Sequence, residues 1–344
     1  MKKSSLLGIM YGFVHFILEV SCFYILSSYY DSDYIWVIGL LYDIMAFLPQ
    51  GFYGYLHDIK IKINFGVLGT VLTTGALVLF SFNVNPFVVI IILTTGNAMI
   101  HLHAAELTLR SSKGRMSPSA FFVSGGSFGV ITGKLLAMYA VPLIYIVVLN
   151  AISIIPILIS MIFKNTFDDN NLRCYNYSNQ RLKSVTIITL ATIVVAVRAY
   201  MGFGIPTSWN KTVLQNVALY CCMGAGKAIG GILIDKIGIR KTALISTVGS
   251  LPLLMFGNNI MSISLVGIMM FSMTMAITLA LIVSELHDYP GVAFGFTTVG
   301  LFIGTLPVFF FRVSSVLVNC IIVSVLSLLS IIILNYICRK ENKK

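Results

Sequence analysis

The sequence predicts an all-α polytopic membrane protein with twelve transmembrane helices. Of its 344 residues, 58% are hydrophobic and only 10% are charged, and the mean hydropathy is +0.94. A soluble domain is usually about 25% charged and about 45–50% apolar. The apolar residues fall in runs of roughly 20, the length that crosses a hydrocarbon core about 30 Å thick. Because backbone groups inside lipid must satisfy their own hydrogen bonds, runs of this length form helices.

The expected spans are separated by short polar loops. They cover residues 6–27, 34–56, 64–83, 86–109, 117–139, 141–163, 184–204, 212–233, 242–256, 260–283, 291–311 and 313–338. Residues 164–183 are polar and read as a cytoplasmic linker. They divide the chain into an N-terminal six-helix bundle, residues 1–163, and a C-terminal six-helix bundle, residues 184–344.

The positive charges predict the orientation in the membrane. With the N-terminus in the cytoplasm, 18 of the 23 Lys and Arg residues fall in cytoplasmic segments. Such a bias indicates a multi-pass protein of the plasma membrane with both termini in the cytoplasm. Basic loops beside anionic lipid account for the net charge of +11. We therefore expect the lipid bilayer as a partner, no nucleic acid, and a monomer.

The sequence shows no pattern typical of a cofactor site or a catalytic centre. The six cysteines have neither paired nor metal-ligand spacing, and we interpret them as packing residues. A His-Glu-x-x-His motif is absent from the sequence. We therefore expect that the protein is not an enzyme and uses no cofactor. The alternative functional class to a transporter is a membrane enzyme or a non-transporting receptor or scaffold.

A charged hairpin follows the second span of each half. The stronger copy contains Gly231, Asp235, Gly238, Arg240 and Lys241, and a weaker copy 177 positions earlier keeps Gly54 and Asp58. An acid at the carboxyl end of a helix is unfavourable unless it caps the next element or pairs with a base, and Arg240 and Lys241 are candidate bases. Gly238 permits a tight turn. We predict that the cluster latches two helices on the cytoplasmic face, the alternative being a static loop.

Small residues recur in spans five and eleven. They are Gly125, Gly129 and Gly133 in the first, and Gly291, Gly295, Gly300 and Gly304 in the second. Glycine at this spacing lets helix backbones approach closely in lipid. We expect both faces to pack against spans of the opposite half and to slide, the alternative being ordinary packing without motion.

The hairpins resemble the signature of the major facilitator superfamily. This resemblance covers the whole chain and implies two six-helix bundles around a central cavity that opens to alternate sides.

A narrower resemblance is to the fosmidomycin resistance protein branch, whose members export drugs or metabolites. It rests on His15-x-x-x-Glu19, on His101 with Arg110-Ser-Ser-Lys113-Gly114-Arg115 and Gly125-Gly126, and on Ser284-Glu285-Leu-His-Asp-Tyr-Pro290-Gly291. The branch has an acid where this chain has His103, and a base where it has Glu106.

Ionisable side chains inside the predicted spans indicate where function resides. Each costs about 2.5–3.5 kcal/mol at a helix centre on insertion scales, so such groups usually face a cavity or a partner. His15 and Glu19 share one face of span one. We expect Asp43 at a similar depth, and Arg198 opposite Glu19, where it would balance the charge. Lys134 lies in the outer half of span five.

A second cluster comprises His101, His103 and Glu106 in span four. His101 and His103 point to different faces of a regular helix, so both cannot bind one metal ion. His103 and Glu106 are three positions apart and are expected to pair. Zinc normally needs at least three convergent ligands, so we predict no metal site.

These features predict a secondary transporter for a small organic molecule. A carboxylate in a low-dielectric cavity favours its protonated form, and a nearby cation reverses this preference. Glu19 is therefore expected to exchange protons during efflux of a drug or metabolite. Two other roles are possible for Glu19: a static ion pair with Arg198, or a direct contact with the substrate. The alternative to efflux is import of a small metabolite, either coupled to protons or by facilitated diffusion.

Overall fold

The computed structural model describes residues 3–59, 61–162, 174–204, 209, 212–257, 259–311, 313 and 315–339. The described chain is helical throughout, apart from loops and one isolated bridge between Ser178 and Cys338. The helices are α1 (Lys3–Ser28), α2 (Ile35–Phe47), α3 (Pro49–Asp58), α4 (Phe65–Ser81), α5 (Pro86–Ser111), α6 (Ser117–Met138), α7 (Leu143–Ile152), α8 (Ile154–Ile162), α10 (Ser184–Gly204), α11 (Val213–Ile237), α12 (Ile239–Val248), α13 (Ser250–Phe256), α14 (Met261–Ser272), α15 (Thr274–Glu285), α16 (Pro290–Phe310) and α17 (Val316–Ile337).

Within the described residues, ten helical segments are long and apolar enough to cross a membrane, against the twelve that we expected. The third expected span is the 17-residue helix α4, which is about 25 Å long at 1.5 Å per residue. The ninth, expected over residues 242–256, is divided at Gly249 into the short helices α12 and α13, and the first turn of α12 carries the charged pair Arg240 and Lys241. Both segments are helical as predicted, but their length and polarity alone do not identify them as spans.

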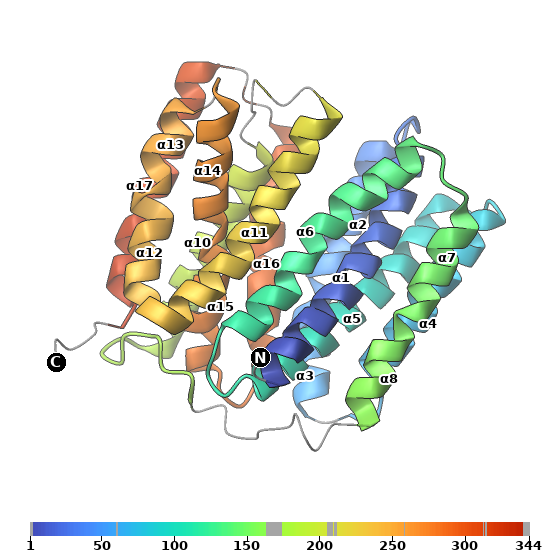
Figure 1. The fold of residues 1–344 in the computed structure, drawn as a ribbon, viewed down its shortest axis with the longest axis horizontal. Helices are drawn as coiled ribbons and strands as arrows, with labels where there is room; N and C mark the ends of the chain where they lie inside the picture. The colour runs from blue at the N-terminus through green and yellow to red at the C-terminus, as the bar shows by residue number, and fades with distance from the viewer. Residues whose placement is uncertain are drawn as a thin grey trace.

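The helices gather in two groups that follow the order of the chain (Figure 1). Helices α1–α8 lie together on one side and α10–α17 on the other, with α6 beside α11 and α3 beside α16 where the groups meet. The predicted linker, residues 164–183, lies partly outside the described residues. Its described part contacts both groups. The hydroxyl of Tyr177 donates a hydrogen bond to Gly114 O (2.6 Å), and the backbone amide of Tyr177 donates one to Ser284 Oγ (3.0 Å).

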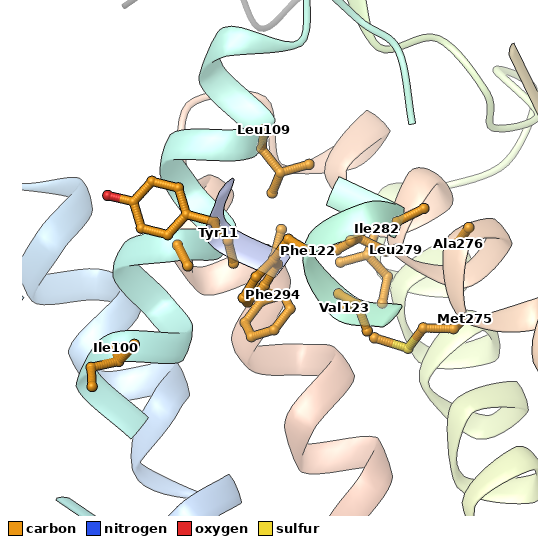
Figure 2. Close-up of a cluster of buried hydrophobic side chains, with 14 of the residues drawn as sticks. Tyr11, Ile100, Leu109, Phe122, Val123, Met275, Ala276, Leu279, Ile282 and Phe294 are labelled. Atoms are coloured by element: carbon orange, nitrogen blue, oxygen red, sulfur yellow. The ribbon is translucent and has the colours of Figure 1, made fainter. Parts of the chain in front are cut away.

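One apolar core runs through both groups. Figure 2 shows Phe122 of α6 next to Phe294 of α16, with Leu279 and Ile282 of α15 close by. The two rings have centroids 6.1 Å apart. The groups are thus joined by buried side chains on this part of their boundary.

The glycine faces correct one prediction. A Cβ atom at Gly125 would overlap the backbone of Gly12, and one at Gly133 would meet Val20 O, so this face of α6 packs against α1 in the same half. Gly291 and Gly295 meet α3 of the opposite half, as expected, whereas Gly300 and Gly304 face α10 of their own half. Spacing predicts close packing, but it does not identify the neighbouring helix.

Candidate functional site

A buried cluster of ionisable side chains joins α1 and α5. His15 and Glu19 lie one turn apart on α1, with His15 Nε2 3.7 Å from Glu19 Oε1. His101 of α5 places its Nε2 3.6 Å from the same oxygen and 2.7 Å from His15 Nε2. The predicted pair on span one therefore acquires a third member from the cluster predicted on span four.

Polar side chains surround Glu19. Asn97, one turn before His101, donates a hydrogen bond from Nδ2 to Glu19 Oε1 (3.2 Å). The same amide lies 3.4 Å from the hydroxyl of Tyr42. Asp43 of α2 lies close enough to Glu19 for their charges to interact, which agrees with the expected similar depth. Sequence reasoning missed Asn97 and Tyr42, although the four-residue spacing from Asn97 to His101 was a usable signal.

The other residues of span four form a separate network toward the hairpins. Glu106 forms ion pairs with His57 of α3 and with Arg110, whose Nε lies 2.5 Å from Glu106 Oε1. Arg110 also lies 3.6 Å from Asp58. We expected Glu106 to pair with His103, but His57 and Arg110 occupy this role.

His103 faces a different neighbour from His101, as the helical spacing predicted. Its Nε2 is 3.0 Å from the hydroxyl of Tyr11, and that hydroxyl is 2.7 Å from Ser160 Oγ. These side chains connect α1, α5 and α8.

A cavity of about 420 Å³ lies within the second group of helices. Arg198 of α10 is on its wall, with Tyr220, Asn216 and Asn319. Arg198 donates to Met275 Sδ (3.2 Å), and among the described residues its buried Nε has no hydrogen-bond partner. The expected ion pair with Glu19 is wrong: among the described residues, no ion pair joins Arg198 to Glu19, because α10 directs the guanidinium into this cavity.

Lys227 of α11 connects the cavity with the Glu19 cluster. Its charge interacts with both Arg198 and Glu19, and it donates a hydrogen bond to Ser127 Oγ of α6 (2.8 Å). Lys227 is not among the predicted site residues, since a lysine near a helix end can extend its ammonium group to the membrane surface. Lys134 of α6 is a predicted site residue, and it donates a hydrogen bond to the hydroxyl of Tyr220 of α11 (2.9 Å), across the boundary between the two groups of helices.

Each predicted hairpin holds a helix of the opposite half through its acid. Asp58 accepts hydrogen bonds from the amides of Gly291 (3.1 Å) and Val292 (2.9 Å) at the start of α16. Asp235 accepts from the amides of Met116 (2.7 Å) and Ser117 (3.0 Å) at the start of α6. A carboxylate at a helix N-terminus is favoured by the unpaired amides and by the helix dipole.

The glycines and bases of the hairpins have distinct roles. A side chain at Gly54 would overlap Gly291, and one at Gly231 would overlap Ala120, so both allow the halves to approach. Gly238 has φ +86°, which favours glycine. Arg240 donates to Asn335 of α17 (3.0 Å). Of the two outcomes left open for Asp235, capping a helix and pairing with a base, the structure shows capping, although of α6 and not of the helix that follows.

Several solved structures of transporters share this arrangement of helices. The chain is similar to the fucose:proton symporter FucP of E. coli, with 12% identity over 96% of this chain and 98% of that chain and a TM-score of 0.65. A bacterial homologue of the iron transporter ferroportin, in the outward-facing state, gives 13% identity, 97% and 98% coverage and a TM-score of 0.61. A second FucP structure is described as a major facilitator superfamily transporter in the outward conformation. It is 14% identical over 97% of this chain and 99% of that chain, with a TM-score of 0.61.

The chain shares the fold of these solved structures, one of which is described as a major facilitator superfamily transporter. No family model matches the sequence, and no curated protein does. The resemblance of the sequence motifs to this superfamily thus agrees with the fold, while the fosmidomycin resistance branch stays a prediction.

Proposed function

We propose that the protein is a secondary transporter that exports a small organic molecule in exchange for protons. The observation that carries the proposal is the position of Lys227, which belongs to one half, donates a hydrogen bond to Ser127 of the other (2.8 Å) and lies close enough to Glu19 for their charges to interact. An ammonium group stabilises a nearby carboxylate, so the proton affinity of Glu19 rises when the halves separate and Lys227 withdraws. Proton binding at Glu19 is thereby linked to which side of the protein is open.

The cavity beside Arg198 is the proposed binding site for the organic molecule. Its volume of about 420 Å³ is within the usual range for small-molecule pockets, about 300–1,000 Å³. Arg198 has a free Nε donor there, and Asn216 and Asn319 provide further polar groups. Because Arg198 and Lys227 interact, a ligand that contacts Arg198 alters the electrostatic surroundings of Glu19 through Lys227.

Import is the second candidate. The fucose:proton symporter with the same fold couples its substrate to protons in one direction, and the arrangement of Glu19 and Lys227 serves either direction. Export rests on the resemblance of the sequence motifs to the fosmidomycin resistance branch.

The test uses the full chain in liposomes that contain a pH-sensitive dye. Sugars, small organic acids and apolar drugs are added one at a time under an imposed pH gradient. We expect at least one compound to drive proton movement in the wild type and in the loop variant Asp31→Asn, and none to do so in Glu19→Gln. Compound flux without proton movement, or coupling retained in Glu19→Gln, would overturn the proton-coupled mechanism.

A further inference from the structure

Three ligand atoms from α1 and α5 converge on one buried point. Nε2 of His15, Nε2 of His101 and Oε1 of Glu19 all lie within 4.8 Å of one another. The side chains of His15 and Glu19 are 8% and 9% exposed, and that of His101 is 12% exposed. Such a set of two imidazoles and one carboxylate, shielded from water, differs from the solvated acidic groups common on protein surfaces.

The backbone determines which imidazole nitrogen faces the cluster. His15 Nδ1 lies 3.0 Å from Phe122 O, and His101 Nδ1 lies 3.0 Å from Asn97 O. A carbonyl oxygen only accepts, so both Nδ1 atoms carry hydrogen and donate. In the neutral rings, both Nε2 atoms then carry a lone pair. Metal-binding histidines are typically oriented in the same way, by a hydrogen bond from the other ring nitrogen.

Two lone pairs that face each other need a cation between them. The Nε2 atoms are 2.7 Å apart, and the carboxylate of Glu19 adds negative charge at the same point. A proton satisfies this arrangement by converting one ring to imidazolium, and a metal ion satisfies it by accepting all three lone pairs. We propose that His15, His101 and Glu19 form a binding site for a divalent transition-metal ion of the zinc class.

The donor set and its spacing suit such an ion. Imidazole nitrogen favours zinc, iron, cobalt and nickel over calcium and magnesium. Zinc–nitrogen bonds of about 2.0–2.1 Å at a tetrahedral angle separate two nitrogens by about 3.3 Å. The rings therefore part by about 0.6 Å on binding. Three protein ligands leave a fourth position open, which is typical of zinc that exchanges or reacts and not of closed structural zinc.

Neighbouring groups adjust the strength of the site. The side chain of Asn97 donates a hydrogen bond to Glu19 Oε1, and its backbone carbonyl accepts one from His101 Nδ1. The loss of such supporting groups typically weakens metal binding about 10–100-fold. The ammonium of Lys227 interacts with Glu19 and opposes a second cation. Removing this charge should therefore strengthen metal binding, an effect that a purely structural cluster would not produce.

The experiment measures metal binding by the full chain in detergent, with a purification tag that contains no histidine. After treatment with a chelator, Zn²⁺ is titrated by calorimetry and Co²⁺ by visible absorption, which reports ligand number and geometry. We expect one ion per chain, a loss of more than about 100-fold in affinity for His101→Gln and Glu19→Gln, and a loss of about 10–100-fold for Asn97→Ala. Lys227→Met should bind more tightly than the wild type.

A matched control uses His287, which lies in the loop before α16 and contacts Tyr175 O (3.0 Å). His287→Gln should bind zinc like the wild type, and circular dichroism identifies any variant that fails to fold. Absence of stoichiometric binding to the wild type, or unchanged binding in folded His101→Gln and Glu19→Gln, would overturn the proposal. The inference goes beyond the proposed function, and binding in detergent is measured without transport, so either can fail alone.

Discussion

Two cysteines near the linker have opposite surroundings. Cys338 is buried beside Ser178, and burial raises the pKa of its thiol to about 12, an effect that Arg240 partly offsets. Cys174 is exposed. Because the thiolate is the reactive form, a raised pKa keeps Cys338 neutral until the pH approaches that value.

We therefore expect a water-soluble maleimide at pH 8 to alkylate Cys174 and to spare Cys338 in the folded protein. Peptide mass spectrometry after quenching measures both sites. The control is the same reaction in denaturing detergent, where both thiols should react. Equal labelling of the two sites in the folded chain would contradict the buried position of Cys338.

At the same scale, the sequence predicts contacts within one helix better than contacts between helices. His15 and Glu19 were paired correctly because four-residue spacing within one helix determines their relation. The partners His101 and Lys227 come from helices whose rotation about their own axes depends on packing. The sequence predicts that Arg198 faces a cavity or a partner, and only the structure shows that this cavity lies among the helices of its own half.

At the scale of helices, glycine allows α1 and α6 to touch. A side chain at Gly125 would overlap Gly12, and one at Gly129 would overlap the backbone of Phe16 and approach Glu19. The contact therefore holds the Glu19 cluster in place from the side of α6. The periodic glycines predicted such a contact, and only the structure identifies α1 as the neighbour.

We expect Gly125→Ala to lower the thermal stability of the protein. Inserting a methyl group into a close contact typically costs about 1–3 kcal/mol. A matched control is Gly75→Ala on α4, where nothing lies within 4 Å of the added carbon. That change should be neutral or stabilise the helix by up to about 1 kcal/mol. Thermal unfolding in detergent, followed by circular dichroism, compares the two, and equal midpoints would refute the packing argument.

At the scale of the whole molecule, hydropathy predicted the membrane fold but not the number of recognisable spans. Within the described residues, ten helical segments are long and apolar enough to be recognised as membrane spans. Helices α4 and α12–α13 are not, since their stability depends on neighbouring helices as well as on their own apolar residues. The hairpin motifs predicted that the halves are latched, while the partners of the latch had to be read from the structure.

Both latches have the same design. An acid at the end of a hairpin helix accepts two amide hydrogen bonds from the first turn of a helix in the opposite half, Asp58 on α16 and Asp235 on α6. Hydrogen bonds to charged groups contribute about 1.5–3 kcal/mol each. Opening this end of the molecule requires both pairs to break, and an amide in place of either carboxylate lowers that cost.

We therefore expect Asp235→Asn to populate a state in which α6 and α11 are farther apart at the hairpins. Spin labels at the exposed positions Lys113→Cys and Lys236→Cys, in a background without the native cysteines, report this distance by double electron–electron resonance. The wild type should give mainly the short distance, and Asp235→Asn should shift the population about tenfold or more toward a longer one. Asp288→Asn removes an exposed carboxylate next to α16 and should leave the distribution unchanged. Identical distributions in the wild type and Asp235→Asn would show that the acid does not hold the halves together, and the link between proton binding and opening would then depend on Lys227 and Glu19 alone.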